Sequence, residues 1–71
     1  MTKPDIEAWL LKHGYEKSNR GDDIWWKGNS KFQLASRHLK HWVNGIKIGS
    51  RPYNSIAINP ETGRLRFFTY A

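Results

Sequence analysis

Cysteine and long apolar runs are both absent from this chain of 71 residues. Without cysteine, the protein can form neither a disulfide framework nor a cysteine-based zinc site. The longest apolar run covers residues 8–11 and is far shorter than a membrane span. Asp5 and Glu7 stand where a secretory signal would carry its apolar segment. The sequence therefore predicts a cytoplasmic protein that does not associate with membranes.

Acidic residues are scarce. Twelve Lys and Arg residues stand against six Asp and Glu residues, which gives a formal net charge of +6 at pH 7. A positive excess on a small domain favours a polyanionic partner, usually a nucleic acid, because cations attract phosphate groups. An acidic protein surface would attract the same cations. The charge therefore predicts the sign of the partner and leaves its class open.

The chain is also too short for a large core. We place a single domain at residues 1–71, and a core of this size contributes only about 3–5 kcal/mol of net stability. Four Trp, three Tyr and three Phe residues are many for this length. Each of them can bury roughly 150–250 Å². Large aromatics therefore compensate for the missing disulfides, and a homodimer would bury further surface.

The clearest structural signal is a β-hairpin over residues 54–70. Pro60 presets φ for the first central position of a turn, and Gly63 supplies the positive φ that closes the turn. Alternation then sorts the strand residues onto two faces. The expected core face consists of Ile56, Ile58, Leu65 and Phe67. The opposite face carries a basic and aromatic stripe of Arg64, Arg66, Phe68 and Tyr70.

An amphipathic helix is predicted over residues 3–13. Thr2 can cap its start, and Pro4 is tolerated in its first turn. Gly14 stands where a residue in the left-handed conformation commonly ends a helix. The apolar side of the helix follows the spacing i, i+3, i+4, i+7 and consists of Ile6, Trp9, Leu10 and His13.

A second hairpin is predicted over residues 24–35, because short aromatic-rich runs flank a Gly/Asn turn at residues 28–30. Side chains alternate between the two faces of such a hairpin. The expected core face holds Ile24, Trp26, Phe32 and Leu34. The opposite face then holds Trp25, Lys27, Lys31 and Gln33.

A second, short helix is predicted over residues 36–44, with Ser36 as its cap and Gly45 as its stop. Leu39, Trp42 and Val43 give it an apolar side, and residues 46–48 alternate like a brief strand. The resulting order is α-β-β-α-β-β, an α+β fold in which two short helices pack on one face of an antiparallel sheet built from two hairpins. The side chains expected to be largely buried are Trp9, Leu10, Trp26, Leu39, Trp42, Ile56 and Phe67.

No catalytic pattern is recognisable. His38 and His41 lie three residues apart on the predicted second helix and could reach one metal ion, but no third ligand follows at a recognisable spacing. Asp22 and Asp23 could pair as metal-binding carboxylates, although a polar turn before a strand is a commoner origin of such a pair. Neither a nucleophile elbow nor a Gly-rich phosphate loop is present. We therefore predict no catalysis, no cofactor and no bound metal.

One resemblance concerns residues 6–35. A helix that ends at Gly14-Tyr15, a polar loop and two strands are similar to the start of HicA-type toxins, which are small RNA-cleaving proteins with a double-stranded-RNA-binding-like fold. That family carries a histidine in the first strand, whereas residues 24–27 of this chain read Ile-Trp-Trp-Lys. The resemblance covers less than half of the chain and leaves out the C-terminal hairpin. We therefore predict neither membership of that family nor RNA cleavage.

Basic and aromatic residues interleave at several places in the chain, which is typical of nucleic-acid binding. Cations contact phosphates, and aromatics exposed on a sheet stack on unpaired bases. We therefore predict a non-enzymatic basic binding module with nucleic acid as its leading partner. The alternative is a phage- or plasmid-type accessory protein that binds and modulates or inhibits a host protein complex, because exposed Trp and Arg also anchor protein interfaces.

The predicted binding surface assumes that both hairpins join one sheet. The stripe of the last strand would then continue onto the outer face of the first hairpin. Two cations of the predicted second helix would add a weaker contribution at the margin. The predicted binding residues are Arg64, Arg66, Phe68, Tyr70, Trp25, Lys27, Lys31, Arg37 and Lys40.

Overall fold

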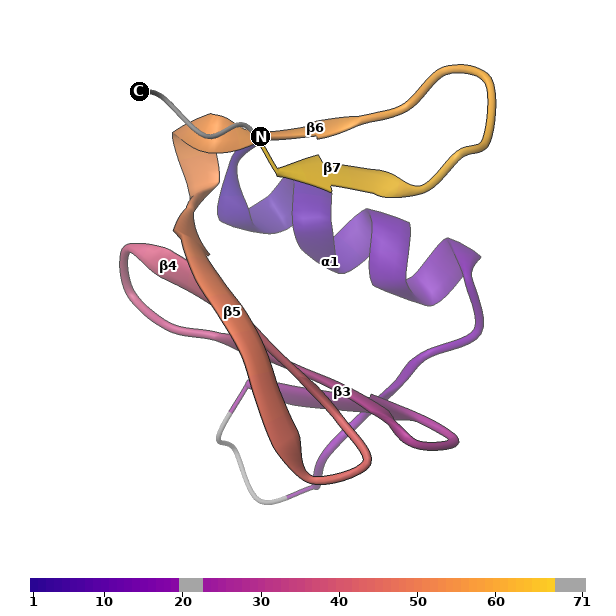
Figure 1. Ribbon diagram of the computed structural model, residues 1–71. Coiled ribbons are helices and arrows are strands. Elements are labelled where there is room, and N and C mark those ends of the chain that lie inside the picture. The colour runs from indigo at the N-terminus through magenta and orange to yellow at the C-terminus, as the bar shows by residue number, and fades with distance from the viewer. Residues whose placement is uncertain (20–22, 68–71) are drawn as a thin grey trace.

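The computed structural model describes residues 1–19 and 23–67. The larger sheet has five antiparallel strands and the smaller has two. Figure 1 shows the helix α1 (Lys3–Lys12) as a layer between them. The protein is therefore an α+β fold, as the sequence predicts. The arrangement differs from the expected one, because the described residues contain one α-helix and the two hairpins belong to different sheets.

The five strands of the larger sheet lie side by side in chain order, each antiparallel to the next. They are β1 (Glu16–Lys17), β2 (Ile24–Lys27), β3 (Ser30–Leu34), β4 (His38–Val43) and β5 (Ile46–Pro52). A short 3₁₀ turn (Tyr53–Ser55) leads out of this sheet. The smaller sheet pairs β6 (Ile56–Ile58) with β7 (Leu65–Phe67), which confirms the predicted C-terminal hairpin.

The start and end of α1 follow from local sequence. Thr2 and Asp5 form a capping box, in which Asp5 Oδ2 accepts from the Thr2 backbone N–H over 2.9 Å. These hydrogen bonds favour the ionised carboxylate and lower the pKa of Asp5 below its ordinary value. Gly14 follows the helix at φ +82°, a conformation that side-chain-bearing residues rarely adopt. The predicted helix is confirmed, one residue shorter at its C-terminal end.

The predicted second helix is wrong: residues 38–43 form strand β4. Asn44 and Gly45 take φ values of +53° and +78° between β4 and β5, as a two-residue hairpin turn of type I′ requires. Gly45, expected to stop a helix, therefore reverses the chain within a sheet. The apolar spacing of residues 39, 42 and 43 fits a helix, but a segment this short cannot be stable as a helix without packing that holds it.

The predicted register of the first hairpin is wrong by one residue. Lys27 pairs directly with Ser30, so the turn contains only residues 28 and 29, and Trp25 pairs with Phe32. A shift of one residue exchanges the two faces of a strand. Consequently Trp25 is 3% exposed beneath α1, whereas Trp26, expected in the core, is 48% exposed on the opposite face.

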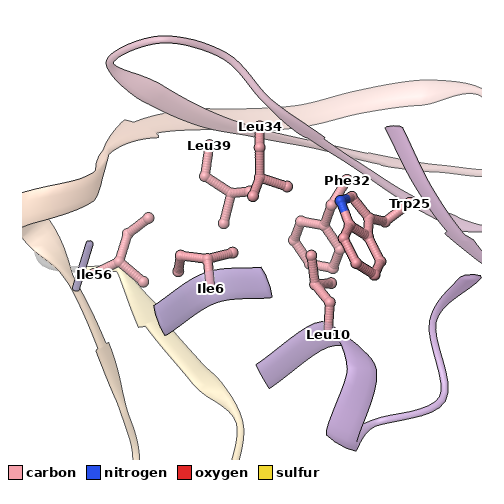
Figure 2. Packing of buried hydrophobic residues seen from close by; sticks show 7 residues of the cluster. All are labelled: Ile6, Leu10, Trp25, Phe32, Leu34, Leu39 and Ile56. Atoms are coloured by element: carbon pink, nitrogen blue, oxygen red, sulfur yellow. The ribbon is translucent and has the colours of Figure 1, made fainter. Parts of the chain in front are cut away.

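The core fills the space between α1 and the larger sheet (Figure 2), where helix residues Ile6 and Leu10 meet side chains from β2, β3 and β4. The expected burial of Leu10, Leu39 and Ile56 is confirmed, and Trp9 packs against the cluster partly buried. Trp42 is half-buried and lies outside the cluster, and the side chain of Phe67 falls outside what the structure describes. The buried apolar residues are Ile6, Leu10, Trp25, Phe32, Leu34, Leu39 and Ile56.

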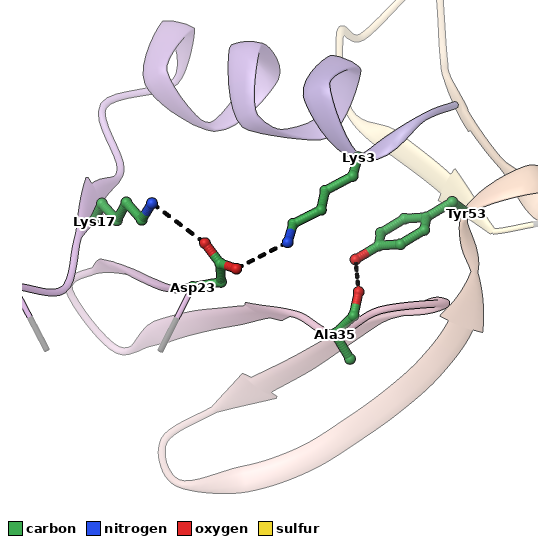
Figure 3. A network of polar contacts seen from close by, with 5 residues as sticks. All are labelled: Lys3, Lys17, Asp23, Ala35 and Tyr53. Carbon is green, nitrogen blue, oxygen red and sulfur yellow. Dashed lines mark hydrogen bonds and ion pairs between the residues drawn. The ribbon is translucent and has the colours of Figure 1, made fainter. Parts of the chain in front are cut away.

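Polar contacts join the layers at their edges. The N-terminal ammonium group donates to the backbone carbonyls of Tyr53 and Ile56, each over 2.9 Å. The Tyr53 hydroxyl donates to the Ala35 carbonyl, and Asp23 forms ion pairs with Lys3 at 2.8 Å and Lys17 at 3.3 Å (Figure 3). Hydrogen bonds from the two lysines hold the pKa of Asp23 below its ordinary value. These contacts fix the start of α1 against both sheets.

Candidate functional site

Trp and Lys side chains alternate across the face of the larger sheet that is turned away from α1. Trp26 of β2 lies opposite Lys31 of β3. Lys31 in turn lies opposite Trp42 of β4, and Trp42 lies opposite Lys47 of β5. Directly opposed residues of antiparallel strands project to the same face, about 4.5–5.5 Å apart. We call these four residues the Trp–Lys ladder.

Cation–π contacts organise the ladder. The Lys31 ammonium nitrogen lies 4.4 Å from the ring centre of Trp42 and 5.2 Å from that of Trp26. Lys47 approaches Trp42 from the next strand, at 6.0 Å. A cation over an indole face is attracted by the ring quadrupole, by about 0.5–1 kcal/mol at an exposed site. The cations are thereby held beside two aromatic surfaces on one sheet face.

The surroundings of the ladder are polar and carry little negative charge. Lys40 lies on the same face, between its cross-strand neighbours Gln33 and Ser50. Glu16 pairs with Trp26 at the outer edge, on β1. The face therefore combines three lysines and two indoles with one described carboxylate at its margin, a composition suited to an anionic partner that also presents flat rings.

The structure separates the predicted binding residues. Lys31 and Lys40 lie on the face of the ladder. Trp25, expected to be exposed, is buried under α1, because the hairpin turn has two residues and not three. Lys27 follows Trp25 onto the helix side, where its ammonium group donates to the His13 carbonyl over 2.7 Å.

The predicted stripe of the last strand does not extend the ladder. The β6–β7 hairpin forms its own sheet, so Arg64 and Arg66, both exposed, do not share a sheet face with Lys31. Phe68 and Tyr70 lie outside the described residues. Arg37 is exposed in the connection between β3 and β4, at the edge of the larger sheet.

Three members of the ladder, Trp26, Trp42 and Lys47, were missed by sequence reasoning. The signal that could have found them is Asn44-Gly45 between two alternating runs, which is a strong short-range indicator of a hairpin. It makes residues 38–43 a strand and places Lys47 opposite Trp42. The exposure of Trp26 then depends on the two-residue turn between β2 and β3.

The histidine pair expected three apart on a helix is split by the strand. His38 and His41 have opposite parity on β4, so His38 shares the ladder's face while His41 stacks on Phe32 beneath α1, at 4.0 Å between ring centres. Among residues 1–19 and 23–67, no three ligating side chains come together as a metal would require. Within the same residues, no helix has the length and apolar character needed to cross a membrane.

No family model, curated protein or solved structure shows a significant match to this chain.

Proposed function

We propose that the protein is a non-enzymatic module that binds single-stranded nucleic acid through the open face of its larger sheet. The observation that supports this proposal is the Trp–Lys ladder, in which indoles and ammonium groups alternate in register across four strands. Unpaired bases stack on aromatic faces, and lysines pair with the phosphates between them. The bases of a duplex are already stacked on one another, so an unpaired strand is the better ligand.

The ladder offers one ring that is already accessible and one that a lysine covers. Trp26 is 48% exposed, whereas Lys31 lies close over Trp42. A base that stacks on Trp42 would displace the Lys31 ammonium group, which is then free to pair with a neighbouring phosphate. The lost cation–π contact is exchanged for stacking, worth about 1–3 kcal/mol per base, and for a charge-assisted hydrogen bond.

Salt dependence tests this binding mode. Fluorescence anisotropy with a labelled, unstructured oligonucleotide would give Kd at a series of salt concentrations, with the matching duplex as a competitor. Each neutralised phosphate contributes about 0.7 to the slope of log K against log salt on a single strand. We expect Lys31→Ala with Lys47→Ala to weaken binding and to reduce this slope by about 1.4. Trp26→Ala should weaken binding by roughly 1–3 kcal/mol with little change in slope.

A matched control removes an equally exposed cation elsewhere. Lys12 lies in the last turn of α1, away from the ladder, and like Lys47 it is exposed. Lys12→Ala should change both Kd and slope less than Lys47→Ala does. Unchanged binding by the Lys31/Lys47 double variant and by Trp26→Ala, in protein still folded by circular dichroism, would contradict the proposed surface.

A protein target is the second candidate, and one observation favours it. Ile46 and Ile48 are 71% and 62% exposed on the edge strand β5, on the face of the sheet opposite the ladder. Exposed apolar side chains on an unpaired edge strand are suited to anchor a protein interface. This candidate corresponds to an accessory protein that modulates a host complex. Binding that is weakened by Ile48→Ser and barely changes with salt would support it over nucleic acid.

A further inference from the structure

A second concave site lies on the other side of the larger sheet, at the end of the molecule where α1 terminates. It is a groove of about 300 Å³, bounded by the last turn of α1, by strands β2, β3 and β4, and by the start of β7. This volume is at the small end for ligand sites, whose usual range is about 300–1,000 Å³. The lining residues are Trp9, His13, Tyr15, Lys27, Phe32, His41, Arg64 and Leu65.

Two contacts from distant segments assemble the groove. Trp9 Nε1 donates to the Gly63 carbonyl over 2.9 Å, which fixes the β6–β7 turn against α1 and brings the next residue, Arg64, to the rim. Across the groove, the Lys27 ammonium group donates to the His13 carbonyl at the end of the helix. The groove therefore exists only in the folded chain.

The walls of the groove are aromatic. The Phe32 ring meets Trp9 edge to face at 6.2 Å and Tyr15 at 5.4 Å between ring centres. His13 stacks on Trp9 at 4.2 Å, and His41 stacks on Phe32. The aromatic side chains that line the groove offer an apolar wall to a planar ligand.

A chain of hydrogen bonds lies behind these walls. The Tyr15 hydroxyl is 2.8 Å from Ser30 Oγ, which is 3.0 Å from His41 Nε2. Each hydroxyl can rotate to donate or to accept. The chain can therefore supply a donor or an acceptor to a polar group that enters between Tyr15 and His41.

Positive charge lies at the mouth of the groove. Lys27 and Arg64 both line it, and none of the described lining residues is acidic. The Lys27 ammonium group has three donors and uses one on the His13 carbonyl, and the Arg64 guanidinium can clamp two oxygens of one phosphate. Cations at the rim are suited to a phosphate group, and rings along the walls are suited to a planar base.

We infer that this groove binds a nucleoside monophosphate, with the base between the aromatic walls and the phosphate between Lys27 and Arg64. The ligand is either a free mononucleotide or the phosphorylated end of a strand, because both present the same chemistry. The site uses residues other than the Trp–Lys ladder and lies on the opposite face of the sheet, so it can be tested separately from the function proposed above.

The test uses the full chain and three probes: adenosine monophosphate, adenosine and inorganic phosphate. Amide and indole NMR signals locate each probe, and titration calorimetry gives its affinity. We expect adenosine monophosphate to bind more tightly than either part and to shift the signals of Trp9, Ser30 and His41. Arg64→Ala should weaken its binding about tenfold, as the loss of a charged hydrogen bond does, and Lys27→Ala should act in the same direction.

Lys12→Ala serves as the control, because it removes an exposed cation that belongs neither to the groove nor to the ladder. It should leave adenosine monophosphate binding unchanged, and Arg64→Ala should leave the binding of an unphosphorylated strand unchanged. Two short oligonucleotides that differ only in a terminal phosphate identify the source. If the phosphorylated strand binds more tightly and Arg64→Ala removes that difference in affinity, the ligand is a strand end. If the two strands bind equally, the ligand is the free nucleotide.

Two results would overturn the inference. In the first, adenosine monophosphate shifts the NMR signals of Trp26 and Trp42 and not those of the groove residues, or it shifts the signals of neither site. The other is binding in the groove that Arg64→Ala leaves at full strength in a folded protein. Arg64 is exposed, so its truncation is compatible with folding, and circular dichroism would check this.

Discussion

The indole N–H of Trp9 donates a hydrogen bond to the backbone carbonyl of Gly63, 54 residues further along the chain, over 2.9 Å. This contact ties the middle layer of the fold to the turn of the outer hairpin (Figure 1). The hairpin has two strands, and isolated two-stranded hairpins are at best marginally stable in water. The stability of the hairpin therefore depends on its contacts with α1.

Trp9→Phe is expected to loosen this hairpin without unfolding the larger sheet. The variant keeps an aromatic ring on α1 but removes the N–H that donates to the Gly63 carbonyl, a loss of about 1 kcal/mol for a typical hydrogen bond. Hydrogen exchange by NMR should show faster exchange of the amides in β6 and β7, with little change in β3 and β4. Trp26→Phe, on the ladder, is the control and should leave the hairpin protected.

Equal exchange rates of the hairpin amides in wild type and Trp9→Phe would contradict this account. The hairpin would then be held by its other contacts, which include Ile56 in the core, Leu65 packed against it and the hydrogen bond from the N-terminal ammonium group to the Ile56 carbonyl.

The elements that the sequence predicted correctly are those with strong local signals. The capping box of Thr2 and the positive φ of Gly14 belong to α1 itself, and Pro60 and Gly63 mark the last turn directly. Signals of this kind need no knowledge of the rest of the fold. The helix and both predicted hairpins could therefore be located from the sequence.

Residues 36–44 were misread because their signal is ambiguous at short range. Leu39, Trp42 and Val43 fit one side of a helix, but in a strand they occupy alternating faces, with Leu39 in the core and Trp42 on the ladder. Pairing with β3 on one side and β5 on the other decides in favour of the strand. Such non-local pairing overrides the weak preference of a short segment.

The candidate site was only partly predictable for the same reason. Lys31 was expected on the outer face of the sheet and lies there, whereas Lys40 was expected on a helix and lies on that same sheet face. The stripe of Arg64 and Arg66 was placed on that surface because both hairpins were assumed to form one sheet. Whether two hairpins share a sheet depends on packing around α1, which periodicity does not encode.

Adjacent tryptophans on β2 provide a direct check of the register. Trp25→Ala should destabilise the fold by about 3–5 kcal/mol, because it removes a large ring that is 3% exposed in the core. Trp26→Ala should cost about 0.5–1 kcal/mol, because it removes a half-exposed ring and its contact with Lys31. Urea unfolding followed by circular dichroism would compare the two variants. Similar losses, or a larger loss for Trp26→Ala, would show that the register is displaced by one residue.

His41 gives the fold a specific dependence on pH. Burial beneath α1 lowers the pKa of the imidazole below its ordinary value of about 6.5. Lys27, Arg64 and Arg51 are the charged residues that line the two grooves beside it, and all three are cations. The neutral ring can accept at Nε2 from Ser30, which in turn can accept from Tyr15.

The direction of the effect follows from proton linkage. Above pH of about 6.5 the histidine is neutral in both folded and unfolded chains, and its contribution to stability is complete. As the pH falls below this value, the unfolded chain binds a proton more readily than the folded chain does. The free energy of unfolding therefore decreases until the pH passes the lower, folded pKa. Asp23, whose folded pKa is also lowered, adds a similar loss only in the more acidic range below about 3.9.

Urea unfolding between pH 7.5 and 5 would measure this decline, and His41→Gln should remove most of it. The glutamine does not titrate, so the variant should start less stable, because it loses the stack on Phe32, but its stability should then change little with pH. His38→Asn is the matched control on the same strand: His38 is exposed on the opposite face, so its replacement should leave the decline intact. A decline of the same size in His41→Gln would assign the pH dependence to other groups, and would show that burial of His41 does not control it.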